Sequence, residues 1–210
     1  DKAHAKPTSP GTLQLIVDGK PVGDPVIFTN DTQGAIELAS IGELLTVGNH
    51  QIQVVMEGGS DMPYSITADY NTLTPNSSQR CKLHLKVVLA DSKIDEGVAT
   101  EANVTVINKT DEKIPTPTAI IGIPAGLEVR HDQLKELVAA GKIAAYEVIG
   151  REVVLYWLGM EAEQRVDLSI SLIAAVPGTY TGPASRAYLY YTDEHKIWND
   201  GLTATITPSK

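Results

Sequence analysis

The fold of this chain is decided by residues 120–157, which read IIGIPAGLEVRHDQLKELVAAGKIAAYEVIGREVVLYW. Near the middle, Leu134, Leu137 and Val138 are spaced i, i+3 and i+4, and this spacing predicts a helix with one apolar stripe. Gly141 follows the last apolar position and is expected to end the helix. A helix of about ten residues is marginal in isolation. We therefore expect it to lie across a sheet.

The residues on either side of this helix supply the sheet. Apolar side chains alternate with other residues both before and after it, which is the period of two that strands have. The alternating residues are Ala119, Ile121 and Ile123 before the helix, and Val153, Leu155 and Trp157 after it. The stretch as a whole is predicted to form a strand, one short crossing helix and a tight hairpin.

The composition is that of an ordinary soluble globular protein. The chain has 210 residues, of which 42% are hydrophobic and 20% are charged, and its net charge is −9. No run of about 18 apolar residues is present, which predicts no membrane insertion. The acidic balance does not favour nucleic acid as a partner. The first residues, DKAHAKPTSPGT, lack the apolar core of a signal peptide, so we expect a processed protein or a fragment of a longer one.

Residues 1–75 are predicted to form antiparallel β structure without a helix. Short alternating stretches are separated by turn signals such as Asp18-Gly19-Lys20. The expected strands are residues 12–17, 26–29, 35–39, 51–56 and 64–70. A single sheet of this size needs a second layer to cover its apolar side. We therefore expect this part to be an incomplete domain.

The polar, turn-rich residues 73–79 (LTPNSSQ) mark a predicted domain boundary. Beyond it the alternating pattern returns repeatedly in residues 80–210. The expected strands are residues 82–89, 102–107, 165–175, 187–191 and 202–206. Together with the central stretch they predict a β-sandwich. The predicted fold class is all-β, with an incomplete antiparallel β domain followed by a sandwich that carries one short helix across its sheet.

The sequence contains no constellation that indicates catalysis. The five histidines show no HxH or HExxH spacing, and the pair Cys81 and His84 lacks a second pair. We therefore expect no metal site and no cofactor. Neither a GxSxG motif nor a phosphate-binding loop occurs, so no catalytic residue is predicted and the chain is not expected to be an enzyme.

The single cysteine and four asparagines allow alternative interpretations. Cys81 cannot form a disulfide within the chain, so it is expected to be a buried small hydrophobic residue or to bond to a partner outside the chain. Asn30, Asn76, Asn103 and Asn108 each begin an Asn-x-Ser/Thr sequon. These sequons have a meaning only in a secreted protein of a eukaryotic host.

Several stretches resemble the alpha-2-macroglobulin family. The stretches that resemble its C-terminal receptor-binding domain are GIPAGLEV (122–129), LKELVAAGKIAAYEVIGREVVLY (134–156) and SRAYLYY (185–191). The stretches that resemble the segment completing a CUB-type β domain in this family are DTQGAIEL (31–38) and MPYSITADYNTLTPNSS (62–78). The motifs GIPAGL and AAGKI resemble the bacterial members of the family more than the animal ones.

This resemblance implies a function as well as a fold. In the family, a proteinase cuts a bait region and is then captured by a Cys-Gly-Glu-Gln thioester, and this motif does not occur in these 210 residues. The resemblance therefore implies a non-enzymatic C-terminal interaction module that packs on the thioester domain of the parent chain and helps to shield it. Residues 1–75 would be the C-terminal part of a CUB-like β domain, and residues 80–210 the receptor-binding-like sandwich. The full-length protein would meet target proteinases in an extracellular or periplasmic compartment.

The same resemblance implies two groups of site residues. In relatives, the first tyrosine of a pair at the end of a strand shields the thioester from water, which corresponds here to Tyr190 followed by Tyr191. Successive strand residues face opposite sides of a sheet. Tyr190 is therefore expected to project from the sandwich, and Tyr191 to pack on the opposite side.

The second group of site residues lies on the helix. In animal relatives, two lysines one helical turn apart carry receptor recognition, and their positions match His131 and Lys135. Arg130 could replace part of the missing charge. Because only one of the matched positions is a lysine, we expect weak or no binding to LDL-receptor-type modules, which are possible partners only if the protein is animal.

Two other classes of function remain open on the sequence. The chain could be a structural pair of β domains from an unrelated surface protein or adhesin, which a complete first domain would favour. It could also be an accessory domain of an enzyme, which only a deep polar pocket with convergent titratable groups would favour.

Overall fold

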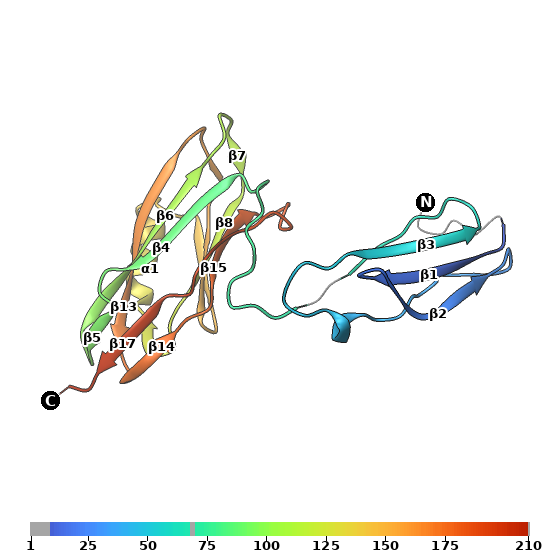
Figure 1. Ribbon diagram of the computed structural model, residues 1–210. Coiled ribbons are helices and arrows are strands. Elements are labelled where there is room, and N and C mark those ends of the chain that lie inside the picture. Colours follow the sequence, from blue (N-terminus) through green and yellow to red (C-terminus); the bar gives the residue numbers. More distant parts are fainter. Residues whose placement is uncertain (1–8, 68–69, 210) are drawn as a thin grey trace. The chain divides into compact units, whose positions relative to one another are not determined.

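The computed structural model describes residues 9–67 and 70–209, and the chain divides into two compact units (Figure 1). Unit 1 is Asp1–Tyr70 and unit 2 is Asn71–Lys210. The division along the chain therefore falls a few residues before the polar stretch 73–79, where the sequence predicts the boundary.

That polar stretch lies in unit 2, where two hydrogen bonds connect it to strand β16 (Ile197–Asn199) and to the residue before that strand. The Ser78 N–H donates to the carbonyl of Lys196 at 2.8 Å, and the Trp198 N–H donates to Ser77 Oγ at 2.9 Å. These bonds satisfy backbone groups at an edge of the sheet that would otherwise need water. A segment that is polar and turn-rich is for this reason docked along a strand rather than free.

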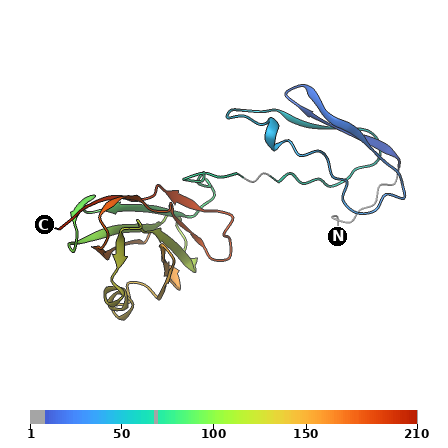
Figure 2. The same cartoon turned by 90° about the horizontal axis from the view of Figure 1, so that it is seen from below.

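Unit 1 is a three-stranded antiparallel sheet in the order β2-β1-β3, with a 3-10 turn, η2, in the loop that follows β2. The elements are β1 (Gly11–Val17), β2 (Lys20–Phe28), η2 (Gly42–Leu44) and β3 (Ile52–Gly58). Asp18 and Gly19 form the β1–β2 turn with φ of 49° and 77°, as the turn signal predicts. Figure 2 shows the loop that carries η2 running along one side of this sheet.

The core of unit 1 is small. Leu13, Leu15 and Val17 alternate along β1 and are all buried, which confirms the predicted strand period. Phe28 is also buried, and its ring lies where a Cβ at Gly11 would come within 2.7 Å of it. Gly11 is therefore required by close packing.

Two strands expected in unit 1 do not form, and those predictions are wrong. Residues 35–39 and 64–67 are irregular, and positions 68–69 lie outside the described residues. Tyr64 and Ile66 alternate as strand residues would, yet they are 86% and 65% exposed. High β propensity produces a strand only where a neighbouring strand is in place to accept its backbone bonds.

Unit 2 is built from four antiparallel or mixed sheets. The five-stranded sheet has the order β10-β11-β8-β15-β16 and the four-stranded sheet the order β4-β6-β13-β9. The strands of the first are β10 (Ala145–Ile149), β11 (Glu152–Tyr156), β8 (Pro117–Gly122), β15 (Ser185–Leu189) and β16. Those of the second are β4 (Leu83–Leu89), β6 (Ala99–Asn108), β13 (Arg165–Ala174) and β9 (Leu127–Val129).

Two smaller sheets complete unit 2. One has the order β14-β17-β5 and includes a parallel pairing of β17 with β5, and the other pairs β12 with β7. Their strands are β14 (Gly178–Thr181), β17 (Thr203–Thr207), β5 (Lys93–Asp95), β12 (Gly159–Met160) and β7 (Ile114–Pro115). One contiguous core joins all of these strands, and its largest fully buried side chains include Leu83, Ile121, Ile123, Leu155, Ile170 and Leu172. The predicted all-β sandwich is confirmed.

Helix α1 (His131–Ala139) is the single α-helix among the described residues, and it lies outside the strands of unit 2 in Figure 2. Leu134 is fully buried, and Leu137 and Val138 are half-buried against the core, so the predicted apolar stripe is confirmed. The helix ends at Ala139, and Gly141 stops it as predicted, because this residue has φ of 66° and donates its N–H to the carbonyl of Val138 at 2.9 Å.

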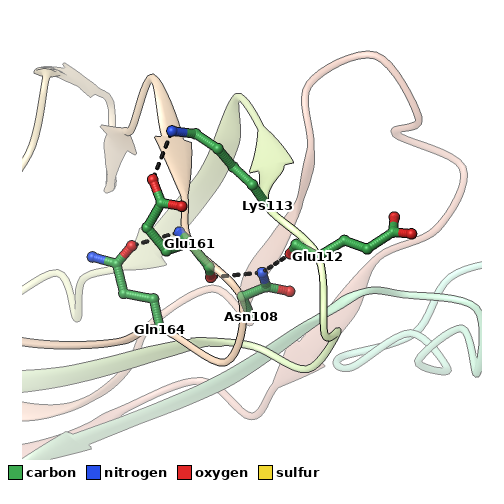
Figure 3. Close-up of polar contacts among 5 residues, drawn as sticks. All are labelled: Asn108, Glu112, Lys113, Glu161 and Gln164. Atoms are coloured by element: carbon green, nitrogen blue, oxygen red, sulfur yellow. Dashed lines mark hydrogen bonds and ion pairs between the residues drawn. The ribbon is translucent and has the colours of Figure 1, made fainter.

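A buried asparagine ties together two turns of unit 2 (Figure 3). Asn108 has no exposed surface, and its side-chain nitrogen donates to the carbonyls of Glu112 at 2.7 Å and Glu161 at 2.8 Å. Its side-chain oxygen accepts from the N–H and hydroxyl of Thr110. Lys113 and Glu161 close the same junction with an exposed 2.6 Å ion pair. This sequon asparagine therefore has a structural role, and its amide is inaccessible in the folded chain.

Candidate functional site: the surface around Tyr190

Tyr190 is anchored through its backbone while its ring is open to solvent. Its N–H donates to the carbonyl of Thr116 at 3.0 Å, one position beyond the paired residues Leu189 and Pro117. The chain turns immediately afterwards, because the Thr192 N–H donates to the Leu189 carbonyl at 2.8 Å. The residue is 55% exposed. Its ring thus leaves unit 2 at the end of β15.

Tyr191 does not pack on the opposite side of the sheet, and that expectation is wrong. It is 80% exposed, and its ring meets the Tyr190 ring edge-on, with the centroids 5.3 Å apart and the planes at 83°. Strand alternation stops at Leu189, where β15 ends. Past that point the turn places both rings outside the core, where they contact each other.

The outer face of the five-stranded sheet next to Tyr190 carries two further tyrosines that the sequence interpretation missed. Tyr156 on β11 and Tyr188 on β15 stand on either side of Thr118 on β8 in the strand register. Part of the signal was present in the sequence, because Tyr188 and Tyr190 are two positions apart in the strand predicted over residues 187–191. That Tyr156 of β11 lies next to them could be seen only from the strand register.

These two phenols are neutral at physiological pH. Burial raises the pKa of Tyr188 above its usual value, although nearby Arg186 opposes this shift. Burial is the main cause that raises the pKa of Tyr156, and the Glu147 carboxylate, which accepts a hydrogen bond from the Tyr156 hydroxyl at 3.3 Å, raises it further. Neutral rings with polar tips suit a contact surface from which water is excluded.

Two rings of this face, those of Tyr188 and Trp198, are in contact with cations. The Lys196 ammonium lies 5.0 Å from the centre of the Tyr188 ring, and the Arg186 guanidinium lies 5.5 Å from the centre of the Trp198 ring. Arg186 also binds Glu152 with two hydrogen bonds, the shorter of 2.6 Å. These contacts connect β15 to β11 and to Trp198 of β16, and the Tyr190–Tyr191 pair beside them is more exposed than the other rings.

The residues of the helix surface lie together and exposed, as their spacing requires. Arg130 precedes α1, and His131 and Lys135 lie one turn apart on it. The His131 ring contacts Tyr146, with the centroids 6.3 Å apart. His131 is therefore in contact with a side chain of strand β10.

A depression of about 270 Å³ adjoins this helix and contains Glu128, His131, Arg151 and Glu152 among its lining residues. The Arg151 guanidinium is engaged by the carbonyls of Ile123, Pro124 and Leu127. Within residues 9–67 and 70–209, no cluster of three or more histidine, cysteine or acidic side chains is placed to hold a metal ion. No helix in the described part of the chain is long and apolar enough to cross a membrane.

Cys81 is 4% exposed, and its sulfur lies 3.7 Å from the carbonyl of Ala187. The prediction of a buried small hydrophobic residue is confirmed. A thiol in this environment is inaccessible to reagents as long as unit 2 stays folded.

The comparisons with known proteins agree with this architecture. The class that the fold defines is the macroglobulin type of all-β protein, here with one helix outside a sandwich. The fold is that of the C-terminal region of bacterial alpha-2-macroglobulins. No protein-family model matches the chain, and no curated protein matches its sequence.

Three solved structures illustrate the likeness. Native alpha-2-macroglobulin from Escherichia coli, from domain MG7 to the C-terminus, matches 95% of this chain with a TM-score of 0.53 and 14% identity. Salmonella alpha-2-macroglobulin reacted with methylamine matches 96% with a TM-score of 0.51 and 19% identity. The native E. coli protein seen by single-particle cryo-EM matches 95% with a TM-score of 0.53 and 13% identity. The chain spans 33% of the first of these chains and 13% of each of the other two.

Proposed function

We propose that this chain is the C-terminal interaction module of an alpha-2-macroglobulin-like proteinase inhibitor, and that it packs on the thioester domain of its parent protein and shields the thioester. The observation that carries the proposal is Tyr190, an exposed ring held by a backbone hydrogen bond at the end of a strand. The likeness of fold over nearly the whole chain supports it. The module itself is non-enzymatic.

Shielding works by denying nucleophiles access to the thioester carbonyl. A small amine attacks that carbon, the C–S bond breaks, and an amide and a free thiol result. A ring that covers the carbonyl keeps water and amines away until the proteinase cuts the bait. A tyrosine suits this task because its body is apolar, its tip tolerates water and only two side-chain torsions must be ordered.

The test uses the parent protein and the rate at which methylamine releases its thioester thiol. We expect Tyr190→Ala to raise that rate about tenfold or more, which corresponds to about 1.4 kcal/mol of lost protection. Tyr190→Phe, which keeps the ring, should stay closer to the parent rate than Tyr190→Ala. Tyr64→Ala, which removes a tyrosine that is 86% exposed in unit 1, is the control. An unchanged rate for Tyr190→Ala contradicts the proposal.

The cysteine of this chain does not interfere with the measurement of the released thiol. Its one cysteine, Cys81, is buried. Thiol reagents will therefore report the thiol of the parent's thioester and not Cys81 under native conditions. Full denaturation supplies the reference in which Cys81 also reacts.

Unit 1 is the C-terminal part of a CUB-like β domain that a further segment of the parent protein completes. Its strands β2 and β3 each pair on one side only among the described residues. Val54 and Met56 stand opposite the buried Leu15 and Leu13 in the register, yet they are 45% and 39% exposed. Complete domains usually cover such edges and apolar faces.

Amide hydrogen exchange on this chain tests that assignment. We expect lower protection across β1, β2 and β3 than across the sandwich strands of unit 2, because unit 1 lacks the layer that would close it. Equal protection in the two units would show that unit 1 is already complete.

The helix surface is the place to test receptor recognition. Arg130 and Lys135 are exposed cations, but His131 stands where animal relatives have a second lysine and is in contact with Tyr146. We expect weak or no binding of LDL-receptor-type modules. Submicromolar binding that Lys135→Ala abolishes would overturn this expectation. Target proteinases are reached only through the full-length protein, in an extracellular or periplasmic compartment.

A further inference from the structure

The backbone at Thr116 has a conformation that a threonine rarely adopts. Thr116 lies between Pro115 and Pro117, and its φ is 46°, in the left-handed region where a β-branched residue is a genuine outlier. A following proline also disfavours compact conformations of the residue before it. Thr116 is thus held in a costly conformation by its surroundings, and such strain concentrates at functional sites.

This conformation aims both backbone groups of Thr116 at their partners. Its N–H donates to the carbonyl of Leu158 at 3.2 Å, and its carbonyl accepts the N–H of Tyr190 at 3.0 Å. The chain passes here from β7, in the two-stranded sheet, to β8, in the five-stranded sheet. A change of sheet within one residue requires the sharp turn that the left-handed conformation supplies.

Thr116 and nearby Thr118 also carry buried hydroxyls without a hydrogen-bond partner. Among the described residues, the buried side-chain polar atoms without a hydrogen-bond partner are Thr116 Oγ1 and Thr118 Oγ1. Thr118 stands between Tyr156 and Tyr188 in the register. Buried unpaired hydroxyls are rare in folded proteins because each forfeits its bonds to water. Strain and unpaired groups therefore coincide beside Tyr190.

We propose that Thr116 is the positioning residue for Tyr190: its left-handed backbone, set between two prolines, points a carbonyl at the Tyr190 N–H and so determines where the tyrosine ring leaves unit 2. This proposal rests on the proposed shielding function, because the position of the ring matters only if the ring covers something. Thr116 touches no reacting atom and acts through Tyr190.

The first experiment measures amide exchange in this chain. The Tyr190 amide should be protected, and it should exchange about tenfold faster or more in Thr116→Pro, which forces φ to about −65° and moves the carbonyl. Thr116→Asn tolerates the left-handed region and should retain the protection. The Ile123 amide, bonded to the Arg151 carbonyl at 2.8 Å, reports whether the sheet remains folded. A Tyr190 amide that is unprotected in the unmodified chain overturns the proposal.

The second experiment measures methylamine inactivation in the parent protein. Replacing the Tyr190 peptide nitrogen by an ester oxygen removes the N–H donor, weakens the Leu189 carbonyl that accepts the Thr192 N–H, and keeps the ring, so it remains informative if Thr116→Pro fails to fold. We expect the ester variant and Thr116→Pro to raise the rate toward that of Tyr190→Ala, and Thr116→Asn to keep the rate of the unmodified protein. If Tyr190→Ala is fast but the ester variant is not, the positioning role is wrong and shielding stands. If Tyr190→Ala is itself unchanged, the shielding function fails and this role fails with it.

Discussion

Gln133 hydrogen-bonds to the backbone of Ser171 as a neighbouring strand would. Its side-chain oxygen accepts the Ser171 N–H at 3.3 Å, and its side-chain nitrogen donates to the Ser169 carbonyl at 2.7 Å. Strand β9 pairs with β13 only along Leu172–Ala174, and beyond it the Arg130 N–H still reaches the Ser171 carbonyl at 3.1 Å. One side chain on the first turn of α1 extends that ladder and fixes where the helix crosses the sheet.

Removing this amide should loosen the helix from the sheet. We expect Gln133→Ala to lower the free energy of unfolding by about 1 kcal/mol, because two partly buried backbone groups lose their partner. Lys135→Ala, on an exposed position of the same helix, should change it by less than about 0.5 kcal/mol. Urea denaturation of both variants makes the comparison, and equal effects would mean that the Gln133 contacts contribute nothing.

The apolar anchor of the helix is Leu134, which is fully buried. We expect Leu134→Ala to cost about 2–5 kcal/mol, since the removed atoms leave a cavity in the core. Leu137→Ala should cost less because Leu137 is only half-buried. The two midpoints of urea denaturation, followed by tryptophan fluorescence, decide the order, and a larger loss for Leu137→Ala would show that the helix packs through its other residues.

The turn junction at Asn108 predicts a large effect from a small polar substitution. Asn108→Ala removes four hydrogen bonds from a fully buried site, so we expect a loss of more than about 2 kcal/mol. Asn103→Ala removes the 2.7 Å bond from Ser169 Oγ at a half-buried position and should cost about 1 kcal/mol. Similar melting temperatures for the two variants would contradict the structural role of Asn108.

A histidine makes the stability of unit 1 depend on pH. His50 Nδ1 lies 2.7 Å from Asp18 Oδ2, and Nε2 lies 2.9 Å from the carbonyl of Thr46, so both nitrogens donate only when the ring is charged. The bond to Asp18, with that to Thr46, raises the pKa of His50 above 6.5. Bonds from His50 and from the Gln51 N–H hold the pKa of Asp18 below 3.8.

The signs of the two shifts define a window of greatest stability. Because the pKa of His50 is raised in the folded state, the stability that this residue contributes to unit 1 is fully present below about pH 6.5. It is lost as the pH rises through the pKa of the folded state. Because the pKa of Asp18 is lowered in the folded state, the stability that this residue contributes is fully present above about pH 4. It is lost as the pH falls through the pKa of the folded state. Unit 1 should therefore be most stable between about pH 4 and pH 6.5.

Amide exchange in β1, measured at about pH 5.5 and about pH 8 and corrected for intrinsic rates, compares the stability of unit 1 on the two sides of the histidine titration. We expect lower protection at the higher pH in the unmodified chain and a smaller difference in His50→Gln. The amides of unit 2 supply the internal control. A difference that persists undiminished in His50→Gln would assign it to another group.

Local patterns were enough to predict most of unit 2. The spacing of Leu134, Leu137 and Val138, with Gly141 after them, predicts the helix and its end. Alternation in residues 119–123 and 153–157 predicts the strands that flank it. These predictions succeed because burial on one face imposes a period of 3.6 or 2 on the residues themselves. The resemblance to the macroglobulin C-terminal region follows from the same stretches and is confirmed as a fold.

Only the tertiary structure decided the features that depend on a partner. Residues 35–39 alternate but have no neighbouring strand to pair with, and Tyr191 lies two residues beyond the end of β15 at Leu189, so strand alternation does not place it. The left-handed Thr116 and the strand-like amide of Gln133 have no local signature, because each exists to meet a backbone group brought near by the fold. Sequence determines which side chains can be buried together, whereas hydrogen bonds between distant segments determine which backbone conformations are kept.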